Sequence, residues 1–523
     1  MRLVASLLVA VLAAACAPKS KPATPQTLDL SLDLTPADAL FDAGCYSCLK
    51  QAFELYDRSL HSLAPPAGAR DKTFVTALLL AAREKELGLT ATPWLERAAA
   101  LAVPDERVYI DIVSSLAWTT AGSATDFEPQ RVGPAARTAW QSFLDSPAGP
   151  DPSATARPRR HAVLDQYLLV ATACVDNARR AGPDLEKRID LRRPVLRYRL
   201  GLCGAAMRSH LEAVLAAEPR FAEAAFFVGR YEMASGVAAP GGGRPNRGWL
   251  STAVPPLRVA HEGIPDAPVV TTVLGNLMRS RTELGRALAL YDDALMLRPT
   301  QRDALLGRTI TLTYLTRRDE AIASATRMIE LGTWYVGEAH YWRALNRYHK
   351  TDLDLAAADV VSARRLLIND DVMTLSGIIA YDQRRPKDAR ADFDGAIRIN
   401  HERCIAHWYV GLLALDESAW SEAVPSFSTA GGCFQRAAES LREEEKQLPA
   451  DLPEETRQEQ LAGFAESIDN SLRQAGRSFL NAAQASLRVG DKAAALGHAR
   501  AASSFDDVKE RAESLVRSLS AQR

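Results

Sequence analysis

Cysteine spacing is the feature of this chain that could carry chemistry, because several of its seven cysteines fall in pairs. Cys45 and Cys48 are three residues apart near the start of a predicted helix, so we expect an intrahelical disulfide. Two free thiols remain an alternative. A redox-active pair is another, because the dipole at a helix N-terminus lowers the pKa of a thiol. Haem attachment would need a histidine after the second cysteine, where the chain has Leu49.

The N-terminal segment carries a further cysteine signal. Arg2 precedes the apolar run Leu3–Leu12, which is too short to span a membrane, and Ala13–Ala15 lead directly to Cys16. This segment resembles the lipobox of bacterial lipoproteins, although Ala13 stands where leucine is commoner. The resemblance implies cleavage before Cys16 and acylation of its thiol, which would hold the protein at a membrane. An ordinary secretory signal that happens to precede a cysteine is the alternative.

Catalytic motifs are absent from the sequence in the forms we considered. The nearest approach to a metalloprotease HExxH is His401-Glu402-Arg403-Cys404, which lacks the second histidine one turn later. There is no GxSxG, and the glycine-rich insertion Gly236–Gly248 has no GK[ST] and follows a predicted helix. We therefore interpret the insertion as a surface loop. We expect a protein that is not an enzyme and that holds no cofactor and no metal.

Composition indicates a helical protein without a nucleic-acid partner. Apolar residues make up 47% of the chain and aromatic residues 7%, which suits closely packed helices. The 63 lysines and arginines balance 64 acidic residues, so the net charge of −1 gives no general attraction to nucleic acid. At 523 residues the chain is too long for one simple core, unless its units stack so that each contacts only its neighbours.

A repeated pattern of small residues supplies such units. In the stretch Pro268–Gln301, two amphipathic helical runs flank a break, with small residues or a ring at Gly275, Ala287, Tyr291 and Ala294. Units with this pattern start at Ala222, Pro268, Arg302, Gly337, Asp370 and Cys404, although the Arg302 unit keeps only Ala321 of the small set. The pattern resembles the tetratricopeptide repeat (TPR). The resemblance implies an all-α fold, a right-handed superhelical solenoid of antiparallel helix pairs.

The chain then divides into five parts. We expect a signal peptide at 1–15, the acylated cysteine and a flexible tether at 16–34, degenerate helical repeats at 35–183, the TPR array at 184–434, and further helical repeats with a capping helix at 435–523. Within the last part, 435–446 and 454–473 are predicted as two longer, irregular helices.

The repeat pattern predicts how the remaining cysteines pair. Cys404 opens the first helix of its unit and Cys433 closes the second, and antiparallel helices bring these two ends to the same edge. A disulfide that closes this loop would stabilise the fold by about 3–4 kcal/mol. Cys174 and Cys203 share the 29-residue spacing, which suggests a second stapled helix pair. Buried free thiols are the alternative for each pair.

The resemblance also implies a binding surface. In this family, certain first-helix positions line a concave groove, and here they carry Phe226, Arg230, Asn276, Arg279, Asp303, Tyr341, Tyr348, Tyr381 and Trp408. Such a groove suits an extended peptide or a helix of a partner protein. We therefore expect a periplasm-facing lipoprotein, anchored in the outer membrane through its lipid, that acts as a scaffold in a cell-envelope complex. A ligand- or glycan-binding module and a thiol-redox protein are the alternatives.

Overall fold

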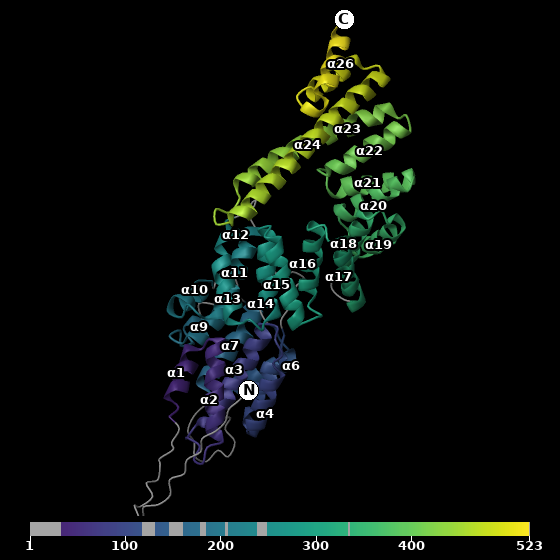
Figure 1. Cartoon of the computed structure of the whole chain (residues 1–523). Helices are drawn as coiled ribbons and strands as arrows, with labels where there is room; N and C mark the ends of the chain where they lie inside the picture. Colours follow the sequence, from purple (N-terminus) through teal and green to yellow (C-terminus); the bar gives the residue numbers. More distant parts are fainter. Residues whose placement is uncertain are drawn as a thin grey trace, which may run out of the picture.

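The computed structural model describes residues 33–117, 131–145, 161–177, 185–203, 208–237, 248–332 and 335–521. The predicted signal peptide, Cys16 and most of the tether lie outside these residues. Within them the fold is all-α, as predicted, apart from one short bridge in which Leu116 of strand β1 (Leu116–Ala117) pairs antiparallel with Val132 of β2 (Arg131–Val132). Figure 1 shows the helices following one another through a long, curved stack.

The N-terminal part consists of short helices, and one of them, α3, is buried along most of its length. They are α1 (Thr35–Ala43), α2 (Tyr46–Leu60), α3 (Ala69–Glu86), α4 (Thr92–Leu101), the 3₁₀ turn η1 (Pro104–Glu106), α5 (Arg107–Ser115), α6 (Pro134–Asp145), α7 (Ala162–Asn177), α9 (Pro194–Gly201) and α10 (Arg208–Ala217). The left-handed conformation of Gly44, with φ of 68°, ends α1 and lets the chain turn into α2.

A buried group of charged residues connects these helices to the first clear repeat. Arg83 of α3 lies 3.5 Å from Glu223 of α11, and its guanidinium sits 3.7 Å from the ring centroid of Tyr198. The hydroxyl groups of Tyr167 and Tyr198 both donate to Glu86. Because ionised groups in a low-dielectric interior are costly unless paired, these contacts fix the relative positions of α3, α7, α9 and α11.

The repeat array follows as consecutive helix pairs, and the predicted unit starts coincide with observed helix starts to within one residue. The helices are α11 (Ala222–Val237), α12 (Trp249–Thr252), α13 (Val254–Gly263), α14 (Pro268–Ser280), α15 (Leu284–Leu297), α16 (Arg302–Tyr314), α17 (Arg318–Leu331), α18 (Val336–His349), α19 (Leu353–Leu366), α20 (Asp370–Asp382), α21 (Pro386–Ile399) and α22 (Cys404–Asp416). The all-α prediction and its repeat register are therefore confirmed.

Glycines and rings meet at equivalent places in these repeats. A Cβ added to Gly275 would lie 2.9 Å from the ring of Tyr291, one at Gly377 would lie 2.7 Å from Phe393, and one at Gly411 would lie 2.8 Å from Phe427. Real Cβ atoms almost never approach so closely. The two helices of a repeat therefore reach their observed separation only because the first helix has no side chain at this position.

The turn inside each repeat has a second recurring feature. The second residue after the first helix adopts a positive φ, between 56° and 66°, at Thr282, Thr316, Thr351, Arg384 and Ser418. A left-handed backbone conformation is unfavourable for side chains with a Cβ, and for threonine in particular. Five equivalent positions hold this conformation, so the packing of the two flanking helices imposes it.

The C-terminal part departs from the predicted helix lengths. α23 runs unbroken from Trp420 to Lys446 and α24 from Glu454 to Val489, so the expected boundary between residues 434 and 435 falls inside a helix. Gly431 lies inside α23. The ring of Phe479 from α24 packs against it there, and the missing side chain makes room for that ring. In Figure 1, α23 runs back from the end of the array toward α12, and α24 returns from there to the C-terminal helices.

The chain ends in a short cap on α24. α25 (Lys492–Ala502), the 3₁₀ turn η3 (Asp506–Val508) and α26 (Lys509–Ala521) follow in sequence. The small residues Ala483, Ala495 and Ala502 are fully buried between the helices of this part. The polar helix α26 lies where a terminal cap was expected.

Glycine-to-alanine substitutions test the contact between glycine and ring. We expect Gly377→Ala to lower the free energy of unfolding by about 1–3 kcal/mol, because the new methyl group overlaps the Phe393 ring. The control is Gly497→Ala in α25, where nothing lies within 4 Å, and helix propensity predicts a gain of up to about 1 kcal/mol. Urea unfolding measures both values. Equal effects of the two substitutions would contradict the packing argument.

Candidate functional site on the first helices of the repeats

The nine predicted groove residues lie on the first helices of the repeats, namely α11, α14, α16, α18, α20 and α22. Their surroundings differ along the array. Those on α11 are buried, those on α14 and α16 are engaged in internal hydrogen bonds, and those on α18, α20 and α22 form a partly exposed set of rings.

The prediction that Phe226 and Arg230 line an open groove is wrong. Phe226 is 0% exposed and packs edge-on against Phe227, with ring centroids 5.1 Å apart. Arg230 is 3% exposed and its guanidinium lies 5.7 Å from the Phe226 ring. The reason is that α11 contacts α10, α12, α13 and α14, so no face of it remains open.

Asn276, Arg279 and Asp303 are half-buried and take part in hydrogen bonds within the array. The hydroxyl group of Tyr291 donates to Asn276 Oδ1 over 2.7 Å, and Arg279 Nε donates to the same hydroxyl over 3.3 Å. Burial raises the pKa of Asp303, partly countered by a hydrogen bond from Tyr335. Through Tyr291, these hydrogen bonds join Asn276 and Arg279 of α14 to the second helix of the same repeat.

Tyr348 and Tyr381 occupy equivalent positions in successive repeats and make equivalent contacts. The Tyr348 hydroxyl donates to Asp382 of the following first helix over 2.9 Å, and the Tyr381 hydroxyl donates to Asp416 over 3.3 Å. Each bond joins one first helix to the next. The sequence could have shown this pairing, since the tyrosine and the aspartate recur at fixed places in the repeat.

Three aromatic residues that the predicted set missed complete the surface. Tyr314 is 59% exposed and lies edge-on to Trp342, with ring centroids 6.2 Å apart. Tyr409 lies edge-on to Tyr381 at 5.2 Å. Each of the three follows, by one position, a place where the family pattern expects a groove residue. We call the whole set the aromatic face: Tyr314, Tyr341, Trp342, Tyr348, Tyr381, Trp408 and Tyr409.

The hydroxyl groups of Tyr341, Tyr348 and Tyr381 on this face remain protonated at neutral pH. Burial raises the pKa of Tyr341 to about 12. Burial, together with the hydrogen bond to Asp382, raises the pKa of Tyr348, and burial with the charge of Asp416 raises that of Tyr381. The face therefore offers flat apolar rings with a few neutral hydroxyl groups, a surface suited to stacking and hydrogen bonding with a peptide or a sugar.

A buried carboxylate supports the aromatic face from behind. Asp359 of α19 has a side chain that is 3% exposed and receives hydrogen bonds from His340, Arg343 and Arg347 of α18, each between 2.6 and 2.9 Å. Burial raises the pKa of Asp359, but the hydrogen bonds from Arg343 and His340 outweigh burial and hold the pKa below its usual range. The cluster fixes the helix that carries Tyr341, Trp342 and Tyr348.

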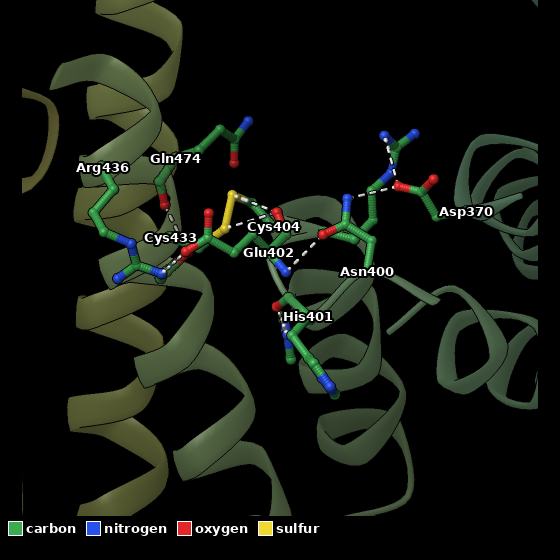
Figure 2. The surroundings of a disulfide bond; sticks show 11 residues. Asp370, Asn400, His401, Glu402, Cys404, Cys433, Arg436 and Gln474 are labelled. Atoms are coloured by element: carbon green, nitrogen blue, oxygen red, sulfur yellow. Dashed lines mark hydrogen bonds and ion pairs between the residues drawn. A yellow bond between two sulfur atoms is a disulfide. The ribbon is translucent and has the colours of Figure 1, made fainter. Parts of the chain in front are cut away.

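The cysteines lie away from the aromatic face. Cys45 and Cys48 are disulfide-bonded at the N-terminus of α2, where Cys45 is 7% exposed. Figure 2 shows the second bond, between Cys404 at the start of α22 and Cys433 in α23, with Cα atoms 5.3 Å apart. Cys203 is also disulfide-bonded. Its expected partner, Cys174, has a side chain outside the described residues, so that pairing stays a prediction.

No helix of the described residues has the length and apolar character needed to cross a membrane, and no three His, Cys, Asp or Glu side chains among these residues are grouped as a metal site.

These observations define an all-α protein whose consecutive antiparallel helix pairs repeat as in a TPR solenoid. No family model matches the chain, and no curated protein matches it. Among solved structures, YrrB, a TPR protein with an unusual peptide-binding site, is 19% identical, with a TM-score of 0.30, over 34% of this chain and 91% of its own.

Two further solved structures are similar to parts of the chain. PilF from Pseudomonas aeruginosa is 15% identical, with a TM-score of 0.28, over 58% of this chain and all of its own. The C-terminal part of a TPR protein from Cytophaga hutchinsonii is 11% identical, with a TM-score of 0.36, over 56% of this chain and 99% of its own.

The charge on Asp359 can be tested by its pH dependence. Its native pKa lies below the unfolded value of about 3.9, so its stabilisation is present above that pH and is lost as pH falls through the native pKa. We expect Asp359→Asn to lower the free energy of unfolding by about 1–3 kcal/mol at pH 7. The difference from wild type should shrink below about pH 4 in urea unfolding experiments.

The control for this prediction is Glu330→Gln, which removes an exposed carboxylate that pairs with Arg327 at 3.3 Å. A surface pair of this kind contributes about 0–1 kcal/mol, so little change is expected at either pH. A loss for Asp359→Asn that stays the same at both pH values would contradict the charge argument.

Proposed function

We propose that the protein is a membrane-anchored scaffold that binds a partner protein through its aromatic face. The observation that carries the proposal is the run of seven partly exposed rings on four successive first helices, α16, α18, α20 and α22. Aromatic side chains dominate binding hot spots because they bury a large area at a small cost in conformational entropy. Successive first helices space these rings along one line, which suits an extended peptide or a helix.

The place of the protein in the cell is part of the proposal. Cys16 follows a signal-like segment, and four of the other six cysteines form two disulfides in the structure. Disulfides persist in oxidising compartments such as the bacterial periplasm. We therefore place the folded part on the periplasmic side of the cell envelope, held at the outer membrane by acyl chains on Cys16, where it would take part in an envelope complex.

The anchor can be tested by removing its thiol. We expect Cys16→Ser to abolish labelling of the protein with radioactive palmitate and to move it from the membrane fraction to the soluble fraction. The control is Cys404→Ser, which leaves the signal segment unchanged and should keep the protein in the membrane fraction. Unchanged membrane retention of the Cys16→Ser protein after salt washing would contradict the lipid anchor.

The aromatic face can be tested by removing two of its rings. We expect Trp342→Ala with Tyr381→Ala to abolish chemical cross-links between the lipoprotein in intact cells and its protein partners, as identified by mass spectrometry. Each ring should contribute about 1–2 kcal/mol or more to binding, because hot-spot aromatics do so when truncated.

The matched control is Val361→Ala with Leu366→Ala, which removes two exposed side chains of α19, 47% and 59% exposed. The cross-links should survive this change, and circular dichroism should show the same helix content in both variants. Loss of the same cross-links in both variants would contradict the aromatic face. So would an absence of protein partners together with saturable binding of a glycan, which is the alternative function.

A further inference from the structure

The long helical hairpin at the C-terminal end of the array is fastened at both of its ends. We call residues 435–473, the outer parts of α23 and α24, the arm. At its base, the Cys404–Cys433 disulfide joins α23 to α22 of the array. The ring of Phe479 on α24 packs against Gly431 of α23. At its tip, the arm lies beside α12 (Figure 1), and it bonds to Ser251 of α12 and to Arg281, the residue after α14.

The contact at the tip is polar and well partnered. Asp451, in the loop between the two arm helices, accepts a hydrogen bond from Ser251 over 2.6 Å and lies 3.2 Å from the guanidinium of Arg281. Gln460 of α24 donates to the backbone carbonyl of Arg281. Arg281 is itself 4% exposed and also pairs with Glu283 over 2.6 Å, so the tip adds partners to a buried ion pair.

Between these two fastened ends the arm has no core of its own. No residue of 439–446 or of 454–474 is buried. By comparison, α21 of the array buries five residues, including Ala389, Phe393 and Ala396. Helical stability in proteins comes mainly from packing of an amphipathic face. The middle of the arm is therefore a helical pair whose apolar side chains still lack a full set of neighbours.

Those side chains line a hollow between the two helices. On α24 they are Ala465, Ile468 and Leu472, which lie at helical spacing on one face. On α23 the same hollow is lined by charged residues, namely Glu439, Arg442, Glu443, Glu445 and Lys446, and Asp469 of α24 completes its rim. An apolar floor beside an acidic rim is unusual for the inside of a helical hairpin and typical of an interaction surface.

We propose that the arm is a second docking surface, which binds a basic amphipathic helix of a partner protein. The apolar face of that helix would pack on Ala465, Ile468 and Leu472 and complete a three-helix bundle. Its lysines or arginines would meet the rim, where four acidic residues outnumber two basic ones. The alkyl stems of Arg442 and Lys446 would extend the apolar contact while their charged ends stay in solvent.

The charge of the arm favours such a partner over a second copy of the chain. Residues 435–473 contain ten acidic and five basic residues, although the whole chain is nearly neutral. Two arms that packed against each other would bring these negative excesses together, which like-charge repulsion opposes. A basic helix is attracted by the same charge.

The test uses the purified chain without its signal segment and two synthetic peptides. One peptide is an amphipathic helix with leucines on one face and lysines on the other, and its counterpart carries glutamates in place of the lysines. We expect saturable binding of the lysine peptide by isothermal titration calorimetry and none of the glutamate peptide. Hydrogen exchange of backbone amides in 439–474 should slow when the lysine peptide is bound.

Charge reversal locates the site. Glu439→Lys with Glu443→Lys should weaken binding about tenfold or more, because both side chains line the hollow. The matched control is Glu459→Lys with Glu466→Lys, which makes the same change in charge at exposed positions of α24 outside the hollow, and it should change affinity by less than about threefold. Trp342→Ala with Tyr381→Ala should leave peptide binding unchanged, so this inference can fail independently of the aromatic face.

Three results would overturn the proposal. The first is no binding of the lysine peptide, or binding without slower exchange in the arm. The second is an equal loss of affinity in both charge-reversal pairs, which would mean diffuse attraction to an acidic surface. The third is a dimer in sedimentation experiments that Ile468→Glu with Leu472→Glu abolishes, which would show that a second copy of the chain occupies the hollow.

Discussion

The close contact between a glycine and an aromatic ring inside single repeats is the interaction on which the array depends. Where Gly275, Gly377 and Gly411 face Tyr291, Phe393 and Phe427, the missing side chain sets the distance between the two helices of a repeat. That distance fixes how the next pair can stack, because each unit contacts only its neighbours. Part of the aromatic face depends on this spacing, because α20 and α22 carry some of its rings as well as Gly377 and Gly411.

Most of the repeat array could be predicted from the sequence because its determinants are local and periodic. A small residue, a ring and a further small residue recur within one helix pair, and the fold reproduces them at Gly377, Phe393 and Ala396. A residue with positive φ also recurs in each turn, but threonine at 316 and arginine at 384 are not residue types that predict a positive φ. Its conformation is imposed by the flanking helices.

The remaining features depend on contacts between residues far apart in the chain. Arg83 and Glu223 pair across 140 positions, and no spacing rule connects them. Phe226 was predicted to line the concave groove from its place in the repeat, but the helices around α11 cover it. Likewise, Gly431 and Gly432 suggest the end of a helix, yet α23 continues because a ring from α24 packs there.

The bridge between the tip of the arm and Arg281 also has a mechanical consequence. The curvature of an open solenoid can change, because small rotations between neighbouring repeats add up along the stack. Here the arm joins two distant points of the stack. The contacts of Asp451 and Gln460 with Arg281 therefore oppose a change in curvature between α14 and α22. A force that straightens the stack would therefore have to break the contacts of Asp451 and Gln460 with Arg281.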